Sequence, residues 1–271
     1  MLDTDQLKEL LATAAGILDS ASPQFVNGHR ADSAVEKKGN DFATDVDLAL
    51  EKRITAELTR LTGIGVHGEE FGGESLDAEQ VWVLDPIDGT FNYAAGLPTA
   101  AILLALLTDG EPVLGLTWLP FTSQRYTAIV GGPVYCNGEP VDALQRTTLA
   151  DSVVATGTYN IDSRGRYPGR FRAAMLANLS RECSRMRMHG STGIDFAYVS
   201  AGILGGAISF GHHAWDHAAG VALVRAAGGV VTDLAGQPWT VTSPSAVAAA
   251  PGVHERMLEL IADAGDPEDY R

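Results

Sequence analysis

An apolar run that ends in two aspartates constrains this chain more than any other segment. Trp82-Val83-Leu84 leads directly into Asp85-Pro86-Ile87-Asp88-Gly89-Thr90. Such a run is typical of a buried strand, and the proline favours extended geometry at Asp85. Open α/β sheets place their ligands at the carboxyl ends of strands. The segment therefore predicts a strand that delivers two carboxylates and a hydroxyl to one edge of a sheet.

The charge balance narrows the range of partners. The chain has 271 residues, with 19 Lys and Arg against 34 Asp and Glu, and a formal net charge of -15. This charge repels the backbone of nucleic acids, so we expect no nucleic-acid partner. An anionic small substrate would need bound cations near it, because the field of the whole protein opposes its approach.

The apolar segments predict no membrane association. The first 20 residues include Asp3, Asp5 and Glu9 and lack the basic region of a signal peptide. The longest apolar run, residues 100–107, is too short to cross a bilayer. We therefore expect a soluble cytoplasmic protein.

Hydrophobic periodicity outlines the elements. An amphipathic helix is expected near the start, where these residues repeat at helical spacing: Leu7, Leu10, Leu11, Ala14 and Leu18. A second helix should begin near Thr44, which forms a capping-box pattern with Asp47. An antiparallel meander is predicted for 100–107, 112–118, 125–130 and 133–135. Further helices are predicted for 171–183, 194–201, 216–227 and 253–264.

The pattern of expected elements suggests two parts without a flexible linker. A loose boundary near residues 144–152 divides an N-terminal α+β part, 1–148, from an alternating C-terminal α/β part, 149–271. We expect the two parts to form one compact unit.

Two further carboxylate clusters lie at expected element ends. Gly68-Glu69-Glu70 follows a short strand over 64–66, and Asp216 lies in Trp215-Asp216-His217-Ala218-Ala219-Gly220 at the start of a helix. Oxygen donors at this density suit Mg²⁺ or Mn²⁺. Taken singly, each cluster has a plain alternative as a turn, a solvated charge pair or a helix cap. The histidines at 212, 213 and 217 suggest a transition metal less strongly, because the other clusters call for a harder ion.

In this order and spacing, the three clusters resemble the inositol monophosphatase family. The resemblance runs from about the first helix to residue 230. It implies a mixed α/β fold, arranged as a layered α-β-α-β-α sandwich. It also implies that the protein forms a homodimer. It also implies Mg²⁺-dependent hydrolysis of a phosphate monoester, with two or three ions and Mn²⁺ as a possible substitute.

The resemblance assigns roles to individual residues. Glu69, Asp85 and the Ile87 carbonyl would hold one ion, and Asp85, Asp88 and Asp216 a second. Thr90, polarised by Asp45 in Ala43-Thr44-Asp45, would orient the attacking water. Glu69 is also expected to be a catalytic residue. Lys38 matches a mobile loop that approaches the metals in relatives.

The substrate contacts are expected from both parts of the chain. Gly89 and Thr90 would bind phosphate, and these residues would contact the substrate: Gly190, Ser191, Thr192, Ser209 and Asp216. Ser209 stands where relatives acting on inositol phosphate commonly carry glutamate, which should weaken discrimination among small phosphorylated polyols.

Several functions stay open at this point. Inositol monophosphate is the expected substrate, whereas histidinol phosphate, fructose 1,6-bisphosphate and 3′-phosphonucleotides are hydrolysed on the same scaffold. A non-enzymatic cation sensor is a further alternative. The presence of both Thr90 and Asp45 favours an enzyme over a cation sensor.

Overall fold

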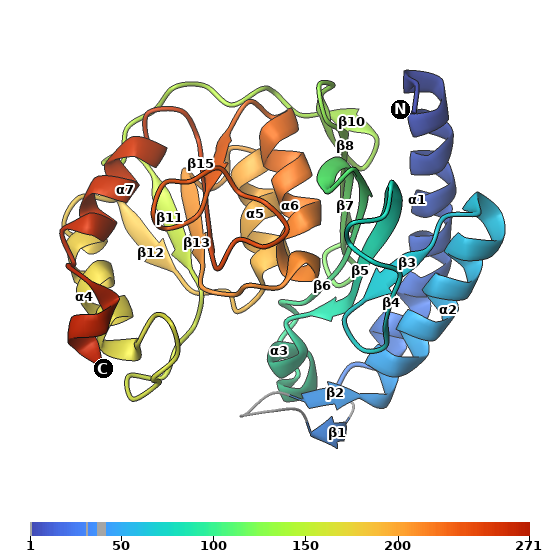
Figure 1. Ribbon diagram of the computed structural model, residues 1–271, viewed down its shortest axis with the longest axis horizontal. Helices are drawn as coiled ribbons and strands as arrows, with labels where there is room; N and C mark the ends of the chain where they lie inside the picture. The colour runs from blue at the N-terminus through green and yellow to red at the C-terminus, as the bar shows by residue number, and fades with distance from the viewer. Residues whose placement is uncertain (1, 31, 37–41) are drawn as a thin grey trace.

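The chain folds into five alternating layers of helices and sheets. The computed structural model describes residues 2–30, 32–36 and 42–271. In these residues, α1 (Thr4–Asn27) and α2 (Asp45–Thr62) form the first layer, and α5 (Thr192–Ser200) and α6 (Ala214–Ala226) lie between two sheets (Figure 1). The outer layer on the other side consists of α4 (Gly169–Ser180) and α7 (His254–Ala262). This order confirms the predicted α-β-α-β-α sandwich.

The larger sheet carries the apolar run that ends in aspartates. In the described residues its order is β10-β9-β8-β7-β6-β5-β3-β4. Its strands are β3 (Val66–Gly68), β4 (Gly72–Gly73), β5 (Gln80–Asp88), β6 (Ala101–Thr108), β7 (Glu111–Leu119), β8 (Gln124–Ile129), β9 (Val134–Cys136) and β10 (Glu139–Pro140). From β6 to β9, each strand pairs antiparallel with the next strand in the chain, which confirms the predicted meander. Strand β3 begins two residues later than the strand expected at 64–66.

The smaller sheet has short strands that the sequence pattern did not resolve. Its order in the described chain is β12-β11-β13-β15-β14. The strands are β11 (Val153–Thr156), β12 (Arg185–Arg187), β13 (Gly206–Ser209), β14 (Val230–Thr232) and β15 (Ala246–Ala249). Strands β13 and β15 are buried throughout. A strand of four residues that is buried on both faces has no polar alternation, so periodicity gives it no signature.

Helix α2 forms as its capping pattern predicts. The side chain of Thr44 accepts from the Val46 and Asp47 backbone N–H groups, and Asp47 accepts in return from the Thr44 backbone, a capping box. Leu50, Ile54 and Leu58 form the buried stripe that packs against the large sheet. The helix ends at Thr62 and is capped by Gly63, whose φ of 71° is a left-handed conformation that glycine adopts at low cost.

Close packing positions helix α6 between the sheets. A Cβ at Gly115 of β7 would lie 2.4 Å from the Ala219 carbonyl oxygen, so only glycine lets the helix approach the sheet this closely. The residues that α6 buries are mainly alanines, valines and leucines. This packing places the first turn of α6, which carries Asp216, beside the end of β5.

Some expectations need correction or stay outside the structure. The helix expected over 171–183 is α4, which ends at Ser180. Lys38 lies outside the described residues, as does the whole polar loop at 37–41. A two-stranded unit of β1 (Ser33–Glu36) and β2 (Phe42–Thr44) flanks this segment. Among the described helices, none has the length and apolar composition that crossing a bilayer requires.

Candidate active site

Two neighbouring parallel strands bring the first pair of carboxylates together. Strand β3 pairs parallel with β5, with Gly68 opposite Leu84. The Glu69 backbone N–H then donates to the Leu84 carbonyl over 3.1 Å. Glu69 and Asp85 therefore follow the last paired positions on adjacent strands. This is the strand-edge arrangement that the sequence predicted.

A bulge turns Asp88 toward the same cavity as Asp85. Asp85 lies opposite Leu103 of β6, and Asp88 lies opposite Ala101. An advance of three residues along β5 therefore matches an advance of two residues along β6. In a regular strand, residues three apart point to opposite faces. The extra residue changes the direction of the strand, and both aspartates line one cavity of about 710 Å³. The Asp85 carboxylate is held by the Ile87 backbone N–H at 3.0 Å.

Four carboxylates gather at this cavity. Glu69, Asp85, Asp88 and Asp216 all line it. Burial raises the pKa of Asp85 well above its usual range, and the charges of Glu69, Asp88 and Asp216 raise it further. Concentrating negative charge in a buried place costs free energy, which a bound cation would offset.

This donor set fits magnesium. The cavity offers carboxylate oxygens and is also lined by Ile87, whose carbonyl is a further hard oxygen donor. Within the described residues, no three His, Cys, Asp or Glu side chains already lie close enough together to hold a metal ion. The four carboxylates line a shared cavity instead.

Asp88 also joins the two parts of the chain. Its carboxylate accepts hydrogen bonds from the Ser191 hydroxyl at 2.5 Å, the Gly193 N–H at 2.6 Å and the Thr192 N–H at 3.2 Å. These donors lie at the start of α5. Burial raises the pKa of Asp88 to about 7, although these hydrogen bonds favour the charged form.

Thr90 follows β5 across a turn that requires glycine. Gly89 has a φ of 92°, a backbone conformation that side chains strongly disfavour. This turn lets the Thr90 hydroxyl reach the Ile87 carbonyl at 3.0 Å and the Asp47 carboxylate at 3.4 Å. Thr90 and Gly89 both line the cavity of the carboxylates.

The acid beside Thr90 is Asp47, so the expected pairing with Asp45 is wrong. Asp45 is exposed at the first position of α2, whereas Asp47 is fully buried. Two residues along a helix are about 200° apart, so the two aspartates face opposite sides. Burial raises the pKa of Asp47, while its hydrogen bonds with Thr44 oppose this shift.

A second acid on α2 was missed. Glu51 is buried, and its carboxylate accepts from the Glu70 and Phe71 backbone N–H groups, each at 2.8 Å. It thereby holds the turn that carries Glu69. Asp47 and Glu51 are four residues apart on the face of the apolar stripe. Charged residues on that face were the signal that could have identified both.

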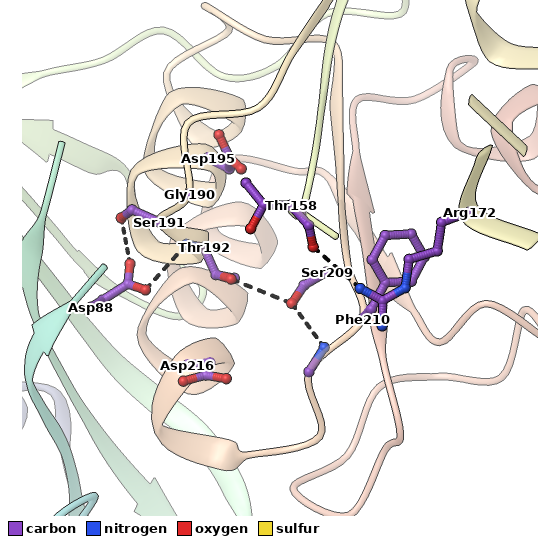
Figure 2. A pocket seen from close by; sticks show the side chains of 12 residues that line it. Asp88, Thr158, Arg172, Gly190, Ser191, Thr192, Asp195, Ser209, Phe210 and Asp216 are labelled. Carbon is purple, nitrogen blue, oxygen red and sulfur yellow. Dashed lines mark hydrogen bonds between the residues drawn. The ribbon is translucent and has the colours of Figure 1, made fainter. Parts of the chain in front are cut away.

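The expected substrate contacts line an adjoining cavity of about 350 Å³. Its lining includes five of the expected residues, which are Asp216, Gly190, Ser191, Thr192 and Ser209 (Figure 2). Asp88 belongs to both cavities. Ser209 ends strand β13, and Ser191 and Thr192 begin α5. The structure thus brings residues of both parts of the chain to one place.

Comparison with known proteins shows which family this chain resembles. The profile of the inositol monophosphatase family matches residues 3–266. The inositol-1-monophosphatase ImpA of Mycolicibacterium smegmatis is 71% identical over 269 residues, 99% of this chain and 98% of the relative. A probable inositol 1-monophosphatase ImpA of Mycobacterium tuberculosis is 64% identical over 261 residues, 96% of this chain and 97% of the relative. The solved structure of a Thermotoga maritima IMPase has a TM-score of 0.85 at 26% identity, covering 99% of this chain and 100% of that chain.

Proposed function

The chain belongs to the inositol monophosphatase family, and from this premise we propose that it hydrolyses inositol monophosphate with magnesium. Its activity is that of a phosphoric monoester hydrolase. The observation that carries the proposal is the convergence of Glu69, Asp85, Asp88 and Asp216 on the cavity that Thr90 also lines.

The carboxylates would hold the metal ions. In this proposal, Glu69, Asp85 and the Ile87 carbonyl bind one ion, and Asp85, Asp88 and Asp216 bind another. Magnesium supplies an activated water and stabilisation of the leaving oxygen when it is bound, and manganese would supply the same chemistry. A third ion is part of the same proposal. The hydrogen bonds from α5 to Asp88 orient that carboxylate before any ion arrives.

Thr90 and Asp47 would handle the attacking water. If the Thr90 hydroxyl donates its hydrogen to Asp47 or to the Ile87 carbonyl, its oxygen can accept a hydrogen bond from a water in the cavity. That bond orients the water for attack on phosphorus. As the water passes its proton to the Thr90 oxygen, the Thr90 hydroxyl would pass its own hydrogen to the Asp47 carboxylate, which thus accepts the proton in the end. Gly89, beside Thr90, lines the place where the phosphate oxygens would lie.

Phosphate release from inositol 1-phosphate tests the proposed function directly. We expect hydrolysis with added magnesium and a loss of activity in excess chelator, because the buried carboxylates cannot replace the positive charge. A malachite-green assay of the purified protein measures the phosphate. Undiminished hydrolysis in the chelator would rule out the metal-dependent mechanism.

Stabilisation by magnesium should depend on pH. The pKa of Asp88 rises from an ordinary 3.8 to about 7, and that of Asp85 also rises. In the metal-free protein these raised values contribute stability below the unfolded pKa, and this contribution is lost as the pH rises toward 7. Magnesium binds the ionised forms and competes with the protons. We therefore expect saturating magnesium to raise Tm more at about pH 8 than at about pH 5.5.

Differential scanning fluorimetry at the two pH values measures this difference. Asp77→Asn is the matched control, because Asp77 is exposed in a turn away from the cavity. Asp85→Asn should abolish most of the magnesium-induced rise. Equal Tm shifts at both pH values would show that protons and magnesium do not share these carboxylates.

The assembly and location of the enzyme are part of the same proposal. We infer a homodimer in the cytoplasm, in line with the family resemblance. Light scattering coupled to size-exclusion chromatography would measure the mass in solution.

A further inference from the structure

The substrate cavity has opposite electrical character at its two ends. Asp88 and Asp216 lie on one side, and Arg172 with Phe210 lies on the other, with Ser209 between them (Figure 2). In the proposed function, the phosphate to be cleaved occupies the carboxylate end. The leaving group then extends toward Arg172.

Arg172 is held firmly without an acidic partner. Its Nε donates to the Tyr167 carbonyl at 2.8 Å and its Nη1 to the Thr158 carbonyl at 3.2 Å. The guanidinium lies 4.2 Å from the centre of the Phe210 ring. Across the described residues, no carboxylate forms an ion pair with it. Two backbone carbonyls use two of the five N–H groups of a guanidinium, so three remain for a ligand.

The charge of Arg172 lies in a partly buried place. Burial lowers the pKa of its guanidinium. A partly desolvated cation gains most from an anion that binds it directly. The stacking on Phe210 and the two carbonyl contacts keep the planar group oriented for such an anion.

Ser209 presents a hydrogen to the same cavity. Trp239 Nε1 can only donate, and it donates to His217 Nδ1 over 3.4 Å. The hydrogen of the His217 ring therefore sits on Nε2, which lies 2.9 Å from the Ser209 hydroxyl oxygen and donates to it. The Gly211 N–H also points to this oxygen at 3.4 Å. With its oxygen accepting, the Ser209 hydroxyl is set to donate.

The neighbour of Ser209 shows where that hydrogen can go. The Thr192 hydroxyl lies 3.3 Å away and can accept it. A substrate oxygen in the cavity can accept it instead. A glutamate at this position would only accept hydrogen bonds, as it does from polyol hydroxyls. Serine, whose hydroxyl oxygen accepts from His217, donates a hydrogen bond into the cavity where glutamate would accept one. It therefore favours a substrate group rich in hydrogen-bond acceptors.

We propose that Arg172 and Ser209 form a second anion subsite, which binds a phosphate or carboxylate on the leaving group of the substrate. This inference rests on the proposed function, because that function places the cleaved phosphate at the opposite end. The enzyme would accept inositol monophosphate and hydrolyse esters with a second anionic group more efficiently. Asp195, the other carboxylate at this cavity, lies 2.5 Å from His189 Nδ1 and is paired there.

Matched substrate pairs test the subsite on the unmodified enzyme. Fructose 1,6-bisphosphate and fructose 1-phosphate differ only in the second phosphate. Glycerate 3-phosphate and glycerol 3-phosphate compare a carboxylate with a hydroxymethyl group. With saturating magnesium, we expect kcat/KM to be about tenfold or more higher for the doubly anionic member. A preference in only one pair identifies which anion the subsite takes.

Arg172→Gln should reduce this preference toward unity. Arg170→Gln is the control, because Arg170 is exposed on the same helix and outside the cavity lining. Ser209→Ala should cause a smaller reduction. If Arg172 serves only to hold the Tyr167 and Thr158 carbonyls, its replacement would lower kcat/KM for both members of a pair equally. That unchanged ratio would overturn the proposal.

The outcomes separate the subsite from the proposed function. Hydrolysis of inositol 1-phosphate with equal kcat/KM within both pairs would overturn the subsite and leave the proposed function standing. Failure to hydrolyse any of these esters with magnesium would overturn both. The wild-type ratios do not depend on whether a variant folds, and circular dichroism checks the variants themselves.

Discussion

Asp85→Asn is expected to lower kcat/KM for inositol 1-phosphate by a factor on the order of 10³ or more, even at saturating magnesium. Asp85 is the carboxylate that the proposed mechanism shares between both ions. It lies within reach of the charges of Glu69, Asp88 and Asp216. Asparagine has one oxygen and no charge, so it cannot serve two ions.

The same substitution should leave the fold intact. The Asp85 carboxylate accepts from the Ile87 N–H, and the amide oxygen of asparagine can accept the same bond. The substitution also removes repulsion among buried carboxylates, so the Tm of the metal-free variant should equal or exceed that of the wild type. Steady-state kinetics and scanning fluorimetry measure the two effects. A stable variant with near-normal kcat/KM would remove Asp85 from the mechanism.

Asp47→Asn should lower kcat by a factor of about 10² to 10⁴, while Asp45→Asn leaves it within about twofold. Asp47 faces Thr90 from inside the fold, and Asp45 points to solvent from the same turn of α2. KM and the magnesium requirement should change little in either variant, because the contact matters mainly in the transition state. The two substitutions are chemically identical, so the comparison isolates position.

Thr90→Ala provides the complementary measurement. If Thr90 and Asp47 act as one unit, each single substitution and the double substitution should lower kcat by similar factors. Additive losses would mean that the two residues act separately. A Thr90→Ala variant with normal kcat and weakened magnesium binding would instead assign the threonine a role in holding the Ile87 carbonyl.

Local sequence signals predicted the elements that carry the site. The apolar run before Asp85 formed β5, the Thr44 and Asp47 pattern formed the capping box of α2, and alternating turns formed the meander. These features depend on residues close in the sequence. The three carboxylate clusters were recognisable for the same reason, since each lies at the end of a strand, directly after a strand or at the start of a helix.

The short strands of the smaller sheet were beyond such reasoning. Strands β13 and β15 have four residues each and are buried throughout. Their pairing joins segments that are far apart in the chain, with Gly206 opposite Ala249. Nothing within either segment specifies that partner, because the packing around both strands decides it.

The sequence by itself determined which chemical groups lie at the ends of β3 and β5 and at the start of α6, because local hydrophobic patterns and turn residues set those ends. Only the tertiary structure decided which groups meet. The bulge between Asp85 and Asp88 depends on register with β6, and the choice of Asp47 over Asp45 depends on which face of α2 packs inward. The donor role of Ser209 depends on a histidine and a tryptophan from other elements. Contacts between distant segments are fixed by packing of the whole chain, which no local pattern contains.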